Sequence, residues 1–198
     1  MAQGDDPATQ NDEPALLRRA QQGDEMAFAE LVRRHQTAVF NVAYRLFGRR
    51  QDAEDAAQEA FLRAYQALDR FDLSRPFAPW IKRITANLCL NWLESERVRP
   101  QVTADVSEQS TVWNDWAATV PTPEQTLLHR EQASRLRNAI LQLSPTYRAV
   151  IEYRHFQEMS YDEIAIVMAR PVSSVKSDLF RARKLLAEYM QHHETGEK

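Results

Sequence analysis

Two patterns decide the fold of this chain: DAEDAAQEAFLRAYQAL at residues 52–68 and WIKRITANLCLNWLESER at residues 80–97. In the first, apolar residues recur at spacings of three and four, which is typical of a helix with one buried face. This stripe consists of Ala53, Ala57, Ala60, Ala64 and Leu68, with Phe61 and Tyr65 beside it. Asp52 precedes the stripe, so we expect it to cap the helix. The acidic and amide side chains that follow form an exposed face.

The second pattern also predicts a helix, with an apolar stripe and a separate polar face. The stripe consists of Ile81, Ile84, Leu88 and Trp92. At about 100° per residue, the polar face gathers Trp80, Arg83, Asn87 and Asn91. Asparagine disfavours a helix but pairs well with base edges, so this face is a candidate DNA-binding surface. On periodicity alone, an ordinary solvated face is the commoner explanation.

Both patterns resemble region 2 of the bacterial sigma factors of the extracytoplasmic-function group. The run at residues 52–61 is similar to the family's helix that binds core RNA polymerase, and the run at residues 77–87 to the helix that opens the promoter. The resemblance implies polymerase-binding side chains at Asp52, Asp55, Gln58, Glu59 and Leu62. It also implies binding of the minus-ten element by Phe71, Arg75, Phe77, Trp80, Arg83 and Asn87.

The loop at residues 69–79 interleaves aromatic residues with arginines, a composition suited to stacking on unpaired bases. The resemblance implies that this loop and the Asn87 face form a pocket for a base flipped from the non-template strand. Flipping costs unstacking energy, which a preformed pocket offsets. Phe71 and Phe77 are alternatively anchors packed beneath the helices. For Trp80, packing in the core is favoured over a wedge at the duplex edge.

A second helical unit ends in MSYDEIAIVMARPVSSVKSDLFRARKLLAEYM, residues 159–190. Ser160 and Glu163 form a capping box that starts one helix. A short turn at residues 169–171 follows, and Ser173 is expected to cap the next helix. This spacing predicts a helix-turn-helix. The last helix has an apolar stripe formed by Val172, Val175, Leu179, Ala182 and Leu186.

The opposite side of this last helix is polar and basic, with Phe180 at its centre. Contact with a thymine methyl group in the major groove would explain the exposed ring, and an intramolecular contact is the alternative. The stretch resembles region 4 of the same sigma group, which reads the minus-thirty-five element. The implied DNA-binding residues are Arg170, Ser173, Ser174, Lys176, Ser177, Phe180, Arg181 and Lys184.

Ser173-Ser174 stands where the family usually has Gly-Thr, an acceptable replacement for the cap. Two further residues depart from the pattern of region 4. Ala169 stands where the family often has glycine, so the turn must be made without a left-handed glycine. Asp178 stands where arginine is common, and we expect it to pair with Arg181, three residues further along the helix. The aspartate at position 178 leaves open which promoter sequence is recognised, but it does not change the expected DNA-binding role.

Composition favours an all-α, soluble globular protein without enzymatic chemistry. Hydrophobic residues make up 43% of the 198 residues, charged residues 27%, and strand-like alternation is scarce. No phosphate-binding glycine loop, HExxH or GxSxG motif occurs, so we predict no catalytic residue, metal ligand or cofactor. The single cysteine, Cys89, is expected to be a core thiol. No signal peptide or membrane span is found, which favours a cytoplasmic location.

The net charge of −3 conceals a segregation of charge along the chain. Basic residues gather at 75–99 and 170–184, whereas acidic residues gather at 1–14, in the 52–68 helix and at 101–125. Affinity for phosphate depends on such local patches rather than on the total charge. The overall negative charge therefore does not exclude nucleic acid as a partner.

We predict two helical domains joined by an acidic linker. Two bracing helices are expected at the start, one from Pro14 that is broken near Gly23 and a second over residues 25–47 that Gly48 ends. The linker contains Trp113 and Trp116, which anchor either in polymerase or on this chain itself. The predicted boundaries are a tail at 1–13, sigma region 2 at 14–99, the linker at 100–124, sigma region 4 at 125–190 and a tail at 191–198.

The favoured hypothesis is a sigma factor that contacts the clamp and the flap of core RNA polymerase's large subunits. It would read the promoter as single-stranded DNA at minus-ten and as double-stranded DNA at minus-thirty-five. Two linked domains gain affinity through effective concentration, so neither needs to bind tightly alone. The resemblance also makes an anti-sigma protein a candidate partner. The alternatives are a stand-alone helix-turn-helix regulator, which would bind its operator without polymerase, and a helical adaptor, which leaves the basic faces unexplained.

Overall fold

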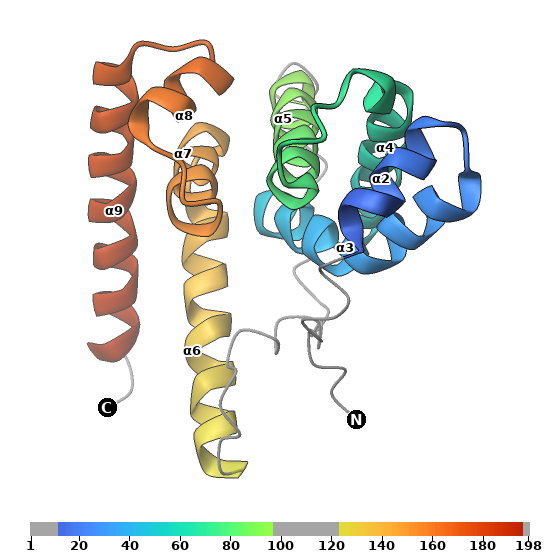
Figure 1. Cartoon of the computed structure of the whole chain (residues 1–198). Helices are drawn as coiled ribbons and strands as arrows, with labels where there is room; N and C mark the ends of the chain where they lie inside the picture. The colour runs from blue at the N-terminus through green and yellow to red at the C-terminus, as the bar shows by residue number, and fades with distance from the viewer. Residues whose placement is uncertain (1–11, 97–122, 196–198) are drawn as a thin grey trace.

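The computed structural model describes residues 12–96 and 123–195, and all regular structure in these two segments is helical (Figure 1). The all-α prediction is thereby confirmed. Trp113 and Trp116 lie outside the described residues, as do most of the predicted linker and nearly all of the N-terminal tail. The first domain contains α2 (Glu13–Gln21), α3 (Glu25–Phe47), α4 (Arg50–Ala67), the short turn η1 (Leu68–Arg70) and α5 (Phe77–Glu96).

Helix α3 lies at the centre of the first domain and contacts α2, α4 and α5. Its ends follow the sequence prediction. The Asp24 carboxylate accepts hydrogen bonds from the amides of Met26 and Ala27 at 3.0 and 3.1 Å, which caps the N-terminus. Gly48 ends the helix with a φ of 78°, a left-handed conformation that glycine adopts without steric cost.

Helix α4 begins earlier than the sequence predicted. Its first residue is Arg50, so Asp52 lies in the first turn, pairs with Arg49, and is not the cap. A carboxylate in the first turn still stabilises the helix, because it lies near the positive end of the helix dipole. The buried stripe also differs by one residue, because Ala56 is buried while Ala57 faces a groove between α3 and α4.

The second domain is a helical unit that ends in the predicted helix-turn-helix. Ser160 and Glu163 make both hydrogen bonds of the capping box, as predicted. The last helix starts at Val172, so Ser173 is not its cap. The wide turn η3, with π-helical hydrogen bonding, was not predicted. The elements are α6 (Pro123–Gln142), α7 (Pro145–Ile151), η3 (Glu152–Phe156), α8 (Tyr161–Val167) and α9 (Val172–Thr195).

The turn between α8 and α9 depends on an alanine in a left-handed conformation. Ala169 has a φ of 50°, which costs a non-glycine residue roughly 1–2 kcal/mol. The amide of the next residue, Arg170, donates a hydrogen bond to the Ala165 carbonyl at 2.9 Å. The chain thus makes the turn without glycine, and the backbone still adopts the left-handed geometry that glycine would provide.

The two domains pack against each other, which the sequence did not indicate. Helix α7 contacts α3 and α5, and α6 contacts α3 (Figure 1). The approach is close at Gly48, where an added Cβ would lie 2.7 Å from Leu141 Cδ1 on α6. Gly48 therefore serves both the end of α3 and the packing of the second domain.

Two glycine substitutions separate the cost of a left-handed backbone from the cost of overlap with Leu141. Gly23→Ala places a side chain at a φ of 90° with no atom within 4 Å, so only backbone strain of about 1 kcal/mol is expected. Gly48→Ala adds the overlap with Leu141 and should lower the free energy of unfolding further. Denaturation in urea, followed by circular dichroism, measures both. Equal losses would show that α6 does not press on Gly48 in solution.

Candidate functional surfaces

The residues predicted to bind polymerase lie along one side of α4. Asp55 and Gln58 are exposed, Asp52 and Glu59 are half-buried, and Leu62 is 58% exposed. At 3.6 residues per turn, all five fall within about a third of the helix circumference. Glu59 is held by Arg63 of the next turn, whose Nε donates to it at 2.7 Å. The structure brings these side chains together as one surface, here called the acidic face of α4.

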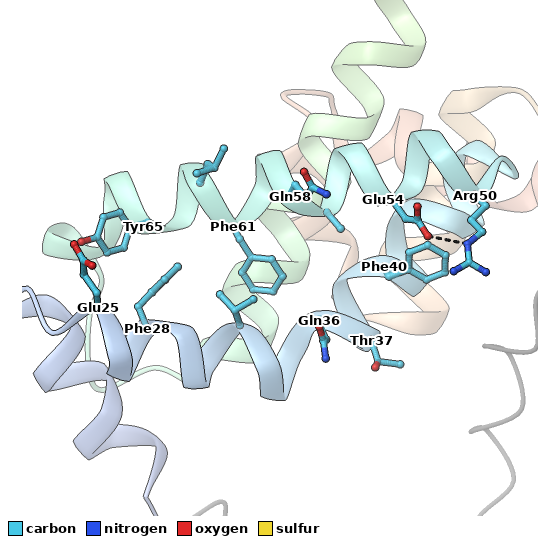
Figure 2. A pocket seen from close by; sticks show the side chains of 13 residues that line it. Glu25, Phe28, Gln36, Thr37, Phe40, Arg50, Glu54, Gln58, Phe61 and Tyr65 are labelled. Carbon is cyan, nitrogen blue, oxygen red and sulfur yellow. Dashed lines mark hydrogen bonds and ion pairs between the residues drawn. The ribbon is translucent and has the colours of Figure 1, made fainter.

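An apolar groove of about 890 Å³ runs beside this acidic face, between α3 and α4 (Figure 2). At one end, the Phe28 and Tyr65 rings lie 4.8 Å apart; at the other, Arg50 and Glu54 form an ion pair. Sequence reasoning missed the groove, although two large apolar residues of α4 outside its alanine stripe, Leu62 and Tyr65, were a signal. The apolar lining consists of Phe28, Val32, Phe40, Ala57, Phe61, Leu62 and Tyr65.

The aromatic residues of the loop before α5 are anchors of the first domain. Phe77 is fully buried and Phe71 is 7% exposed, and the two rings lie 6.0 Å apart, edge to face. Trp80 is half-buried, with its ring 4.6 Å from that of Phe71. The predicted contacts of Phe71 and Phe77 with unpaired bases need correction, because burying large rings in the core is favourable and leaves no face for stacking.

Arg75 is an exposed cation of this loop, with 74% of its side chain accessible. It pairs with Asp72 at 3.3 Å, and the Asp72 carboxylate also accepts hydrogen bonds from the Ser74 hydroxyl and amide. The Ser74 hydroxyl is the main cause that lowers the pKa of Asp72, followed by the Ser74 amide. The loop is therefore ordered by its own polar contacts, with Arg75 at the surface.

Arg83 and Asn87 lie on the side of α5 that faces the second domain. The Tyr153 hydroxyl donates a hydrogen bond to Asn87 Oδ1 at 2.6 Å. The positive charge of Arg83 acts on Tyr153 and on Glu163, both in the second domain. Of the residues predicted to bind the minus-ten element, Trp80, Arg83 and Asn87 thus lie on α5, and Asn87 is engaged by the second domain.

Helix α9 presents a cationic face around an exposed ring. Val175, Leu179 and Ala182 are buried against the domain, and Phe180 on the other side is 70% exposed, which argues against an intramolecular contact for its ring. Ser174 is half-buried. The remaining predicted residues of this helix are exposed, namely Ser173, Lys176, Ser177, Arg181 and Lys184.

Arg170 and Asp178 form an ion pair that fixes the turn of the helix-turn-helix. Asp178 is 8% exposed, and the expected partner, Arg181, points to solvent instead. The expectation was wrong because it considered only neighbours on the same helix, whereas Arg170 reaches Asp178 from the turn. The Arg170 guanidinium is therefore paired within the protein. This argues against its expected role as a phosphate contact.

The described segments contain no candidate metal site and no candidate membrane span. Among these residues, no three histidine, cysteine or acidic side chains are grouped so that they could hold a metal ion. None of their helices is long and apolar enough to cross a membrane. Cys89 is buried, as predicted for a core thiol, and burial raises the pKa of its thiol.

Two family models match this chain, one for each domain. The description "Sigma-70 region 2" matches residues 31–99, which include the acidic face of α4 and helix α5. The description "Sigma-70, region 4" matches residues 133–186, which include the helix-turn-helix. The chain belongs to the sigma-70 family.

Relatives of this sigma factor place it in the extracytoplasmic-function (ECF) group, as its sequence patterns had indicated. It is 32% identical over 177 residues to the ECF RNA polymerase sigma factor SigW of Bacillus subtilis, covering 88% of this chain and 95% of the relative. It is 34% identical over 185 residues to the RNA polymerase sigma-H factor of Pseudomonas aeruginosa, covering 92% and 96%. The ECF sigma-E factor of Escherichia coli is 34% identical over 178 residues, covering 89% and 93%.

Solved structures support the same architecture for the sigma factor. CnrH in complex with the cytosolic domain of CnrY has a TM-score of 0.58 at 26% identity, covering 91% of this chain and 97% of that one. RpoE in complex with the anti-sigma factor NepR from Bartonella quintana has a TM-score of 0.59 at 18% identity, covering 83% and 96%. The second likeness shows a shared fold.

The ion pair at the turn can be tested by removing its charge. Asp178→Asn keeps the shape of the side chain but leaves Arg170 without its carboxylate, so the free energy of unfolding should fall by roughly 1–3 kcal/mol. Glu188→Gln is the matched control, because its exposed pair with Lys184, at 3.9 Å on the same helix, contributes little. Urea denaturation compares the two, and similar losses would argue against a structural role for Asp178.

Proposed function

We propose that this sigma factor binds core RNA polymerase and directs promoter-specific initiation, with its two domains reading the minus-ten and minus-thirty-five elements. One observation carries the proposal: a single chain holds an acidic docking face in its region 2 domain and an exposed cationic helix in its region 4 domain. A stand-alone helix-turn-helix regulator would use the second surface and leave the first unexplained. Regulation by an anti-sigma protein belongs to the same proposal.

The acidic face of α4 and the groove beside it are the proposed docking site for the polymerase clamp. Gln58 and Leu62 belong to both, so the charged and apolar surfaces are continuous. A complementary partner would place basic side chains over Asp55 and Glu59 and apolar side chains in the groove. Such charge complementarity speeds association, while buried apolar anchors supply most of the binding energy.

The minus-ten element is assigned to the exposed part of the loop and α5. Arg75 is accessible to a phosphate, and the Asn87 amide offers both a donor and an acceptor to a base edge. Arg83 and Trp80 flank that amide on the same helix. Phe71 and Phe77 would support this surface from beneath, because both rings are in the core.

The minus-thirty-five element is assigned to the exposed face of α9, inserted in the major groove. Lys176, Arg181 and Lys184 would hold phosphates or base edges, and the Phe180 ring would contact a thymine methyl group. Arg170 would act indirectly, by positioning the turn through Asp178. Because both domains are fixed to one polymerase, weak contacts at each element combine into spacing-dependent recognition.

Reversing two charges tests the docking site. Asp55→Arg with Glu59→Arg should lower run-off transcription roughly tenfold or more at limiting core polymerase, because the docking face would repel a basic partner. Asp69→Arg is the control, since it reverses an exposed charge outside that face. The template is a promoter found by mapping transcription starts after overexpression. If the wild type gives no promoter-dependent product, the proposed function is wrong; if the double variant is fully active, the docking assignment is wrong.

Substitutions on α9 test the DNA-binding face. Phe180→Ala should weaken holoenzyme binding to the duplex promoter by about 1–3 kcal/mol, the range for a specific base contact. Ile166→Ala is the control, because it removes another large, 79% exposed side chain from the same domain. For Lys176→Ala and Arg181→Ala, the slope of log affinity against log salt should fall by about 0.9 for each phosphate that the side chain neutralises. Unchanged affinity and slope would exclude this face from DNA contact.

A further inference from the structure

We propose that two side chains at opposite ends of α2, Gln21 and Glu13, are positioning residues that hold the loop before α5 in the shape that reads the minus-ten element. Neither residue would touch DNA. Each holds the backbone at one end of the loop, residues 71–76. The part of the proposal that concerns DNA rests on the minus-ten assignment above. The holding of the loop does not, because it concerns only contacts within the first domain.

Gln21, the last residue of α2, holds the start of the loop. Its Nε2 donates hydrogen bonds to two backbone carbonyls, that of Leu68 at 2.8 Å and that of Phe71 at 2.9 Å. The Leu68 carbonyl lies at the end of α4, where backbone carbonyls have no amide in a following turn and are satisfied by other groups. The Phe71 carbonyl follows the short turn η1 and begins the loop. One side-chain amide thus uses both of its N–H groups to join the end of α4 to the loop.

The position of Phe71 matters because its ring packs beneath the α5 surface. The ring centroid lies 4.6 Å from that of Trp80 and 6.0 Å from that of Phe77. Trp80 is half-buried and belongs to the predicted minus-ten surface. By holding the Phe71 backbone, Gln21 therefore also fixes the ring against which Trp80 packs.

Glu13, the first residue of α2, holds the other end of the loop. Its carboxylate lies 2.8 Å from His35 Nε2 on α3. The His35 ring centroid in turn lies 5.2 Å from that of Phe77, the first residue of α5. The hydrogen bond with His35 is the main cause that lowers the pKa of Glu13, and a hydrogen bond from the Phe77 backbone lowers it further. The carboxylate therefore serves as an acceptor at the start of α5, where backbone amides have no partner within the helix.

The loop needs these two contacts because its own polar contacts are local and exposed. Asp72 pairs with Ser74 and Arg75, and the Asp72 and Arg75 side chains are 56% and 74% exposed. Such contacts order a turn but do not fix where it lies relative to the helices. Gln21, 50 residues earlier in the chain than Phe71, supplies that link. A loop held in its binding shape loses less conformational entropy when a strand binds.

Amide hydrogen exchange in the free full-length chain, followed by NMR, tests whether Gln21 holds the loop. Gln21→Met keeps the length of the side chain and removes both donors. The amides of Phe71 and Arg75, which are hydrogen-bonded within this segment, should then exchange roughly tenfold faster. Gln22→Met makes the same substitution at the exposed neighbour and should leave both amides unchanged. Gln21→Lys keeps N–H donors at this position and should restore part of the protection.

Recognition of the minus-ten element is measured with holoenzyme and a fluorescent single strand that carries the minus-ten region of a mapped promoter. If the loop of Gln21→Met is in place about a tenth of the time, the Kd for this strand should rise roughly tenfold. The loss of affinity caused by one changed base in the strand should shrink as well. Affinity for core polymerase, and for a duplex with only the minus-thirty-five element, should not change. These two readouts distinguish a positioning role from general destabilisation of the domain.

Glu13→Ala is the second variant and acts at the other end of the loop. It should speed exchange of the Phe77 amide and weaken binding of the same single strand. Glu25→Ala is its control in the exchange measurement, because it removes an exposed carboxylate from the first residue of the next helix, α3.

Three outcomes separate the parts of the proposal. Unchanged exchange in both Gln21→Met and Glu13→Ala would overturn the holding of the loop by α2. Faster exchange with unchanged strand affinity would overturn the role of α2 in reading the minus-ten element. A wild type with neither strand binding nor promoter-dependent run-off product would overturn the proposed function and the DNA part of this proposal, whereas the exchange result would stand.

Discussion

The arrangement of this sigma factor depends on a guanidinium and a carboxylate that are buried together between two domains. Arg45 belongs to the first domain and Glu152 to the second, and the two side chains meet in an ion pair with two hydrogen bonds. Burying either charge alone would be costly, so the domains adopt the one orientation that joins them. Around this contact, Tyr153 reaches Asn87 and α6 reaches Gly48. The ion pair acts together with a continuous apolar core to which both domains contribute.

In this orientation the functional surfaces differ in how far the other domain covers them. Helix α4, which carries the acidic face, lies on the far side of α5 from α7 (Figure 1). The Phe180 ring on α9 is exposed. The α5 face lies between the domains. Under the proposed function, the docking surface for polymerase is therefore exposed in this arrangement, while Asn87 on α5 is engaged by Tyr153.

Sequence patterns were sufficient wherever the cause is local. Gly48, the Ser160–Glu163 box and the apolar stripe of α9 each follow from the conformation of a few consecutive residues. Contacts between distant segments could not be predicted in this way. Arg45 and Glu152 are 107 positions apart, and no periodicity connects them. Likewise, helix spacing suggested a partner for Asp178 on its own helix, whereas the true partner comes from the preceding turn. The burial of Phe71 depends on tertiary packing in the same manner.

The wide turn η3 adds a constraint of a different kind. Its hydrogen bonds span one residue more than those of an α-helix, as in the bond from the Gln157 amide to the Glu152 carbonyl at 3.1 Å. The direction of the side chains after such a turn depends on the number of residues in it. Deleting one residue at 152–156 would rotate the preceding helix relative to the following one. Chain length in this segment, and not only its amino acids, should therefore be restricted in relatives that share the interdomain contact.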